Sequence, residues 1–330
     1  MRRAAHAAAL GCAGVAVWVL VTGAGMASDP PAGRSAGPAA YEGAGVAAGS
    51  SGEGRARGWH GAFLPHGWIA TPRSQADIAR HLDELARARV TAQIHNLGRL
   101  DADGRVPRAE YAGLSRWVRT SRRKHPEQRI YAWISGAEGE HLGRVGIRAR
   151  VARWLSAFAD ETGVDGIVLD IEPFRRDGRS LARLAAAARR ASPSLWIGIS
   201  APPDARWGKG VVRELGWAAS AVMPMMYDTA ATNRRAYVAT VDAAVSHYAS
   251  TLPRRKILPI LPAYGRNPWH RPAVENIQTA MAGVRRAAVR GYRVGGLAVY
   301  WWWEMSATEK ADWARAGSAT RAPASEPISG

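Results

Sequence analysis

Short apolar runs alternate with longer amphipathic stretches along most of the chain. Eight apolar runs end in polar, glycine, proline or aromatic residues, and they cover 61–69, 90–98, 129–136, 164–173, 194–203, 220–228, 256–265 and 294–305. Continuous apolar runs of this kind are typical of parallel strands that are buried on both faces of a sheet. The pattern therefore predicts eight buried strands.

Stretches with helical spacing lie between and after these runs. They cover 74–89, 108–124, 148–163, 178–191, 209–220, 234–250, 273–291 and 306–317. Ser74 and Ser306 are expected helix N-caps, and Gly163 is an expected helix end. Alternation of eight strands with eight helices predicts an α/β fold, a (β/α)8 TIM barrel, with its chemistry at the C-terminal ends of the strands. An open doubly wound sheet is the alternative, but no G-x-G-x-x-G follows the first strand.

The first residues have the pattern of an export signal. Two arginines precede an apolar run, and small residues around Ala27 offer a cleavage site. We expect a signal peptide at 1–27, a disordered Gly/Ala/Pro-rich linker at 28–57, the barrel at 58–316 and a loose tail at 317–330. An uncleaved anchor is the alternative. Once the signal is removed, we expect a secreted monomer without stable membrane insertion, with retention at the cell surface left open.

Charge and histidine spacing exclude several classes of partner. The 330-residue chain has a formal net charge of +18, and 41 of its 45 basic residues are arginines. No basic run is interleaved with aromatic residues, so no nucleic-acid partner is expected. The arginines fit solvated outer helices, and an acidic polymer or anionic wall as the setting is the alternative. The nine histidines form no H-x-H or H-E-x-x-H, so no metal and no cofactor are expected.

Carboxylates and aromatic residues gather where the predicted strands end. They are Trp133 on the third strand, Asp170 and Glu172 on the fourth, Tyr227 and Asp228 on the sixth, and Tyr300, Trp301, Trp302, Trp303 and Glu304 on the eighth. In a barrel these ends meet at one mouth. Aromatic rings stack on sugars and carboxylates act on glycosidic bonds, so the combination is typical of a carbohydrate site.

Strand parity sharpens the prediction for the fourth strand. Residues two apart share a face, so Val168, Asp170 and Glu172 are expected to point into the barrel, with Glu172 highest. Two carboxyl groups this close are expected to couple, so that one holds a proton while the other stays ionised. The alternative is a structural ion pair with an arginine such as Arg175.

Several stretches resemble one known family. The sequence DGIVLDIE at 165–172 resembles the D-G-x-D-x-D-x-E signature of glycoside hydrolase family 18, the chitinase family. MMYD at 225–228 resembles the M-x-Y-D motif of that family, ISG at 134–136 faintly resembles its S-x-G-G, and GGLAVYWWW at 295–303 resembles its last strand. The resemblance covers roughly 58–315, and the order of the motifs along the barrel makes it specific.

The resemblance implies a mechanism and a substrate class. Glu172 would be the general acid and then the base, while the acetamido oxygen of the substrate attacks in place of an enzyme carboxylate. Asp170 would orient the acetamido group, Tyr227 would hydrogen-bond its oxygen, and Asp228 would assist. The implied function is that of an exported glycosidase that acts on a β-linked glycan containing N-acetylhexosamine.

Further residues are candidates for substrate binding, and some depart from the family pattern. Trp133 and Trp269 are candidate binding residues, Asp165 fits binding and structure equally well, and the aromatic floor is either Tyr300 or Trp302. Trp207 is a second loop residue that could stack on a sugar, and His95 and Asn96 fit either the pocket or local backbone bonding. Val168 stands where the family has an aspartate, and Pro173 follows Glu172 directly.

Two other functions remain open from the residues alone. One is a carbohydrate-binding protein on an inactive glycosidase scaffold, although the retained Glu172 speaks against it. The other is a glycosidase with two enzyme carboxylates that acts on another hexosamine polymer. The seventh strand supplies no carboxylate, so that route needs Asp228 or Glu304 as the partner of Glu172.

Overall fold

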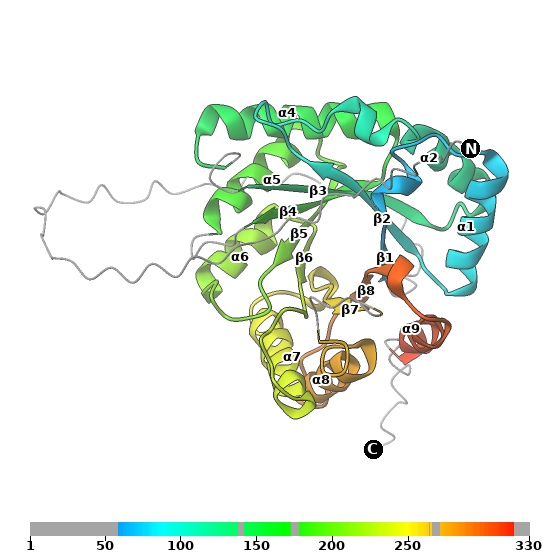
Figure 1. Cartoon of the computed structure of the whole chain (residues 1–330). Coiled ribbons are helices and arrows are strands. Elements are labelled where there is room, and N and C mark those ends of the chain that lie inside the picture. Colours follow the sequence, from blue (N-terminus) through cyan, green and yellow to red (C-terminus); the bar gives the residue numbers. More distant parts are fainter. Residues whose placement is uncertain (1–58, 138–141, 173–177, 264, 266–270, 320–330) are drawn as a thin grey trace, which may run out of the picture. The chain divides into compact units, whose positions relative to one another are not determined.

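Figure 1 shows the computed structural model of the chain, which describes residues 59–137, 142–172, 178–263, 265 and 271–319. The expected signal peptide at 1–27, the expected linker at 28–57 and most of the expected tail lie outside these residues, as does Trp269. Within the described ranges, no helix is both long and apolar enough to cross a bilayer.

The parallel strands of the described residues curve into a barrel. They are β1 (Trp59–Leu64), β2 (Ala92–Arg99), β3 (Arg129–Ala137), β4 (Gly166–Glu172), β5 (Trp196–Ala201), β6 (Ala221–Pro224), β7 (Ile260–Pro262) and β8 (Gly296–Tyr300). Neighbours pair in the order β6-β5-β4-β3-β2-β1-β8-β7. Parallel bridges from Val222 to Ile257 and from Met225 to Ile260 join the two outermost strands. The predicted (β/α)8 barrel is confirmed.

Helices surround the strands (Figure 1). They are α1 (Gln75–Arg87), α2 (Leu114–Lys124), α4 (Val145–Thr162), α5 (Arg179–Ala191), α6 (Lys209–Ala218), α7 (Arg234–Ala249), α8 (Ile277–Val289) and α9 (Ala307–Ala319). Ser74 accepts a hydrogen bond from the Asp77 N–H at 3.1 Å, and Ser306 accepts one from the Glu309 N–H at 3.2 Å. Gly163 ends α4 in the left-handed region at φ 74°. These three expected helix boundaries are confirmed.

Two apolar cores follow from strand alternation. The larger one lies between the strands and the helices, and the smaller one fills the barrel interior. At the N-terminal end of the interior, Trp59 and Trp196 stack at a centroid distance of 6.2 Å. Gly61 and Gly198 make room for them, because a Cβ there would lie 2.5 Å from the Trp59 ring and 2.7 Å from the Trp196 ring. These rings close the bottom of the barrel and leave polar residues to the opposite end.

Candidate active site

The two carboxylates of β4 lie on the inward face of the strand. Val168 is fully buried in the inner core, Asp170 is 9% exposed, and Glu172 is exposed at the end of the strand. Alternate residues of a strand share a face, so Glu172 stands nearest to the mouth. The expected parity of the fourth strand therefore agrees with the structure.

Asp170 is held from the neighbouring strand β3. The Trp133 Nε1–H donates to Asp170 Oδ2 at 3.1 Å. Burial raises the pKa of Asp170, and the hydrogen-bonding influence of Trp133 and of Ser200 on β5 lowers it by less. Within the described residues, Asp170 Oδ1 is buried without a hydrogen bond of standard geometry. One oxygen is thus fixed, and the other remains able to accept a further hydrogen bond.

Glu172 sits among like charges. Part of its side chain reaches solvent, yet the walls of the mouth displace water from the carboxyl group and raise its pKa. The negative charges of Asp170 and Asp228 raise this pKa further, and Arg206 lowers it. The Arg206 guanidinium already donates to both carboxylate oxygens of Asp204 at 2.8 Å. The net effect moves the pKa of Glu172 toward neutral pH, which suits a proton donor.

Aromatic residues form the wall beside these carboxyls. The rings of Tyr227 and Tyr300 stack at 4.9 Å with an angle of 12°, and Trp133 meets Tyr300 edge-on at 5.7 Å. The Tyr227 hydroxyl donates to Met225 Sδ at 2.8 Å. Burial raises the pKa of both tyrosines, so their hydroxyls stay protonated and able to donate.

Tyr300 and Trp302 occupy opposite faces of the last segment. Strand β8 ends at Tyr300, which packs against the inner core, and a short 3₁₀ helix follows at Trp302–Glu304. Trp302 is 1% exposed, packs in the outer core and lies under the Lys310 ammonium. The expectation that strand parity brings Trp302 to the mouth is wrong, because the strand has ended two residues earlier. Trp269, a further candidate, lies outside the described residues.

Asp165 stands at the other end of β4 from Glu172. It accepts hydrogen bonds from the Ile130 N–H at 2.8 Å and from Arg129 Nη1 at 3.1 Å. Arg122 adds an ion pair at 3.5 Å. These contacts join the N-terminal ends of β3 and β4, so they favour the structural one of the two roles that the sequence leaves open.

Two other residues whose place in the pocket the sequence leaves open belong to the outer core. His95 is fully buried on the outward face of β2, where its ring meets Trp117 edge-on at 4.8 Å, and burial lowers its pKa to about 3. Trp207 is 1% exposed, so it is not a stacking surface for sugar. Asn96 uses its Oδ1 to accept the Gly98 N–H at 2.7 Å, which is the local backbone role.

The comparisons with known proteins rest on structure alone. No family model matches the sequence, and no curated protein matches it either. A chitinase from Chromobacterium violaceum aligns at a TM-score of 0.57 and 16% identity over 79% of this chain and 99% of its own. A family GH18 chitinase from Cycas revoluta, in complex with allosamidin, gives 0.58 and 13% over 79% and 99%. The spore cortex-lytic enzyme SleL of Bacillus megaterium gives 0.55 and 12% over 79% and 74%.

The barrel is chitinase-like in fold.

One carboxylate near the mouth of this chitinase-like barrel is not among the residues predicted from the sequence. Glu275 lies before α8, is 3% exposed, and accepts hydrogen bonds from the backbone N–H groups of Asp228 and Thr229, each at 2.9 Å. It lies 47 residues from Asp228 and in no motif, so the sequence holds no signal for this contact.

The chemistry available at the mouth is acid–base chemistry with hydrogen-bond donors. Within the described residues, no three His, Cys, Asp or Glu side chains are placed to hold a metal ion. The arrangement instead offers a carboxyl group with a raised pKa at the rim, a second carboxyl beneath it, and tyrosine hydroxyls beside both. Such a set can donate a proton, take it back, and orient a polar substituent of a ligand.

Proposed function

We propose that the protein is an exported glycosidase that cleaves a β-linked glycan containing N-acetylhexosamine. The observation that carries this proposal is the pair Asp170 and Glu172 on one inward strand face, with raised pKa values, beside the stacked rings of Tyr227 and Tyr300. The alternative is a structural ion pair with an arginine such as Arg175, which lies outside the described residues. Among the described residues, the arginine that lowers the pKa of Glu172 is Arg206, and its guanidinium is shared with Asp204.

In the proposed reaction, Glu172 carries the proton. It donates this proton to the glycosidic oxygen as the bond from that oxygen to C1 of the sugar breaks. The acetamido oxygen of the same sugar attacks C1 and forms an oxazolinium ion. A water molecule then adds to C1, its proton passes to Glu172, and the acetamido group is released with the original configuration at C1.

Asp170 and Tyr227 position the acetamido group in this proposal. Asp170 accepts the acetamido N–H and stabilises the positive charge of the oxazolinium ion, while Trp133 keeps the carboxylate in place. The Tyr227 hydroxyl donates to the acetamido oxygen. Its present acceptor is the thioether sulfur of Met225, a weak acceptor that a substrate carbonyl replaces at little cost.

The similar structures support the same class of reaction. The Chromobacterium violaceum and Cycas revoluta proteins are chitinases, and the proposal transfers glycan cleavage, but not chitin itself, to this chain. Chitin itself is not transferred because Val168 stands where the chitinase family, which this sequence resembles, has an aspartate. The carboxyl group beneath Asp170 and Glu172 is therefore missing in this chain. Export rests on the signal peptide expected at 1–27.

The decisive experiment compares the wild type with Glu172→Gln on a panel of amino-sugar glycans. Glutamine keeps the shape but cannot donate the proton, so the rate is expected to fall by about 10²–10⁴. Thr240→Val, on the outer helix α7, is the matched control and is expected to retain full activity. Equal activity of wild type and Glu172→Gln would exclude Glu172 as the acid. Glycan binding without cleavage by either would favour a binding protein.

A second measurement separates the substrate-assisted route from a covalent one. A thiazoline mimic of the oxazoline intermediate is expected to inhibit the active enzyme competitively, and allosamidin, the ligand of the Cycas revoluta chitinase, serves as a second probe. Asp228 is the alternative carboxylate that acts electrostatically on Glu172. An active enzyme that ignores the thiazoline but traps a covalent glycosyl adduct would favour the covalent route, and the residue that carries the adduct, Asp228 or Glu304, would be the nucleophile.

A further inference from the structure

The loop after β6 is fastened to a buried carboxylate from another part of the barrel. The Asp228 N–H donates to Glu275 Oε2 at 2.9 Å, and the Thr229 N–H donates to Glu275 Oε1 at 2.9 Å. The Thr229 hydroxyl adds a third bond to Oε1 at 2.6 Å. Glu275 is 3% exposed, so water does not compete for these bonds. Hydrogen bonds to a buried charged group are among the stronger ones in proteins.

The backbone of this loop needs such support. Asp228 and Ala230 both lie in the left-handed region, at φ 52° and 58°. This region is sterically disfavoured for residues other than glycine, for alanine more than for aspartate. Arg271 donates to the Ala231 carbonyl at 3.4 Å, and Arg234 donates to the Ala273 carbonyl at 2.9 Å.

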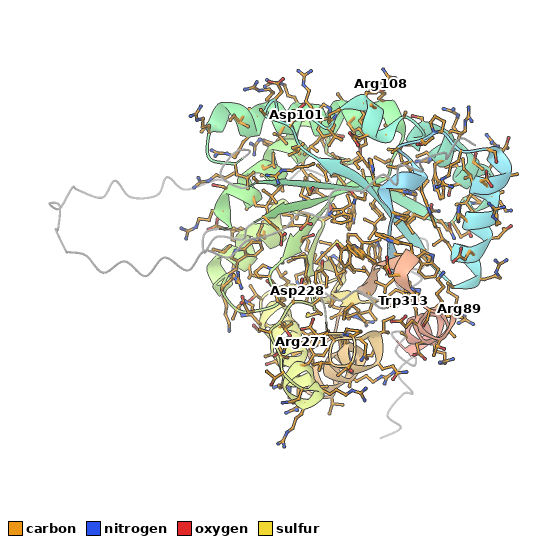
Figure 2. The ribbon with its side chains drawn as sticks, viewed as in Figure 1. Arg89, Asp101, Arg108, Asp228, Arg271 and Trp313 are labelled. Carbon is orange, nitrogen blue, oxygen red and sulfur yellow. The ribbon has the colours of Figure 1, made fainter. Side chains whose placement is uncertain are left out.

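These contacts tie the loop after β6 to the segment before α8. Figure 2 labels Asp228 and Arg271 near one another in this part of the barrel. The three hydrogen bonds to Glu275 therefore hold a conformation that the loop sequence does not favour by itself.

We propose that Glu275 is a positioning residue that fixes the backbone at Asp228 and thereby holds the Asp228 carboxylate at the mouth, facing Glu172. The geometry of this inference is independent of the reaction, but its consequence for catalysis rests on the proposed function. Glu275 itself does not touch the reacting atoms. It acts through Asp228, whose charge reaches the proposed acid.

The groups around Glu172 define the expected effect. Glu172 faces Asp170 on its own strand and Arg206 after β5. It also faces Asp228 and the Tyr227 hydroxyl after β6, and the Tyr300 hydroxyl at the end of β8. On the other side, Glu275 acts electrostatically on Tyr237 of α7. Arg271 and Arg234 donate to the backbone carbonyls of Ala231 and Ala273, in the two segments that Glu275 joins. A negative charge near Glu172 raises its pKa. If Asp228 loses its fixed place, the pKa of Glu172 falls, and Glu172 loses its proton at a lower pH.

The test is a titration of Glu172 that needs no substrate. The carboxyl carbons of ¹³C-labelled glutamate are followed by NMR, and the Glu172 signal is assigned by its absence in Glu172→Gln. In Glu275→Gln, an amide replaces one of the two acceptor oxygens, so at least one of the two backbone bonds is lost. We expect Glu275→Gln to lower the pKa of Glu172 in the same direction as Asp228→Asn, and by less.

A double variant separates positioning from the charge of Glu275. Loss of the Glu275 charge would by itself also lower the pKa of Glu172, and that direct effect would persist when Asp228 is asparagine. A positioning effect would vanish, so the double variant is expected to match Asp228→Asn alone. An unchanged titration in Glu275→Gln, or full additivity in the double variant, would overturn the proposal.

Two further variants guard against a folding defect and a trivial charge effect. Thr229→Val removes the hydroxyl bond to Glu275 together with the 3.4 Å bond from the Ala231 N–H to the same hydroxyl, and it is expected to give a smaller shift of the same sign. Glu309→Gln makes the same chemical change at the N-cap of α9, where Glu309 accepts from the Ser306 N–H at 2.8 Å, and is expected to leave the titration of Glu172 unchanged.

Activity then distinguishes this inference from the proposed function. If the glycan panel is cleaved, Glu275→Gln is expected to move the alkaline limb of the kcat/KM profile to lower pH together with the measured pKa. If nothing is cleaved while the titrations behave as stated, the positioning role stands and the proposed function fails. If glycans are cleaved while the titration of Glu172 does not respond to Glu275→Gln, the proposed function stands and the positioning role fails.

Discussion

At the scale of single residues, Val168 determines how the carboxyl pair of Asp170 and Glu172 is held. It is fully buried among the apolar residues of the barrel interior, directly beneath Asp170 on the same strand face. A carboxyl group at this position would share the interior with Asp170 and would have no water around it. In this chain, Asp170 is instead held from the side, through the hydrogen bond from the Trp133 indole on β3.

This arrangement predicts that an ionised aspartate at position 168 destabilises the folded protein. The carboxyl of Val168→Asp would be buried, and burial raises its pKa above the unfolded value of about 3.9. The added cost is therefore small at low pH and grows as the pH rises through the folded-state pKa. The loss of unfolding free energy is expected to be larger at about pH 8 than at about pH 5, by about 1.4 kcal/mol for each unit by which the folded-state pKa exceeds about 5, up to about pH 8.

The neutral variant Val168→Asn is the control for this prediction. It buries a polar group of similar shape without a charge, so its loss of about 1–3 kcal/mol is expected to be the same at both pH values. Thermal or denaturant unfolding of both variants measures the difference. A pH-independent loss in Val168→Asp would mean that the new carboxylate finds a partner or water, contrary to the packing of the inner core.

At the scale of elements, the end of β8 separates a residue of the inner, mouth-side face from a residue of the outer core. Tyr300 is the last residue of the strand and contacts Tyr227 and Trp133, whereas Trp302 begins the next helix and packs in the outer core. We expect Trp302→Leu to lower the unfolding free energy by a few kcal/mol, toward the roughly 3–5 kcal/mol of full truncation, while the folded fraction binds glycan normally.

Tyr300→Leu is the matched variant and is expected to show the opposite pattern. It removes a ring that faces the mouth, so the affinity for a glycan is expected to fall by about tenfold or more, in line with the 1–3 kcal/mol of an aromatic stacking contact. Calorimetric binding and thermal unfolding of the two variants give the comparison. Weaker glycan binding in Trp302→Leu with unchanged stability would contradict the placement of the two rings.

The regularity of individual strands and helices explains which predictions from the sequence agree with the structure. Periodicity predicts the barrel because each strand is apolar on both faces and each helix on one, and parity predicts β4 because that strand is regular from Gly166 to Glu172. Parity fails at Trp302 because the residue at which a strand ends depends on packing. The position of His95 near a strand end leaves its role open, and the structure decides it, because His95 alternates with the inward Ile94 and faces outward. The contact from Glu275 to Asp228 depends on the closed barrel.

At the scale of the whole molecule, the positive charge is unevenly distributed. Helices α2, α4 and α5 are neighbours on the outside of the barrel (Figure 1). Helices α2 and α5 carry nine arginine and lysine residues and no aspartate or glutamate, whereas α1 and α9 together carry four basic and five acidic residues. The net charge of +18 therefore does not spread evenly over the outer helices. This asymmetry favours attraction of a polyanion to one side of the barrel.

The charge asymmetry predicts salt-dependent binding to an anionic polymer through α2 and α5. With inorganic polyphosphate as the probe, the association constant is expected to fall steeply with salt, with a log–log slope of about 0.7–0.9 per phosphate contact. Replacement of the exposed Arg119 and Arg183 by glutamine is expected to weaken binding several-fold and to reduce the slope by about 1 per lost contact.

The control replaces the exposed Arg235 and Arg285 of α7 and α8 by glutamine. It changes the net charge by the same amount but leaves the charge of α2 and α5 unchanged. Equal losses in both double variants would assign the attraction to net charge alone, and activity on a neutral oligosaccharide is expected to be unchanged in all of them.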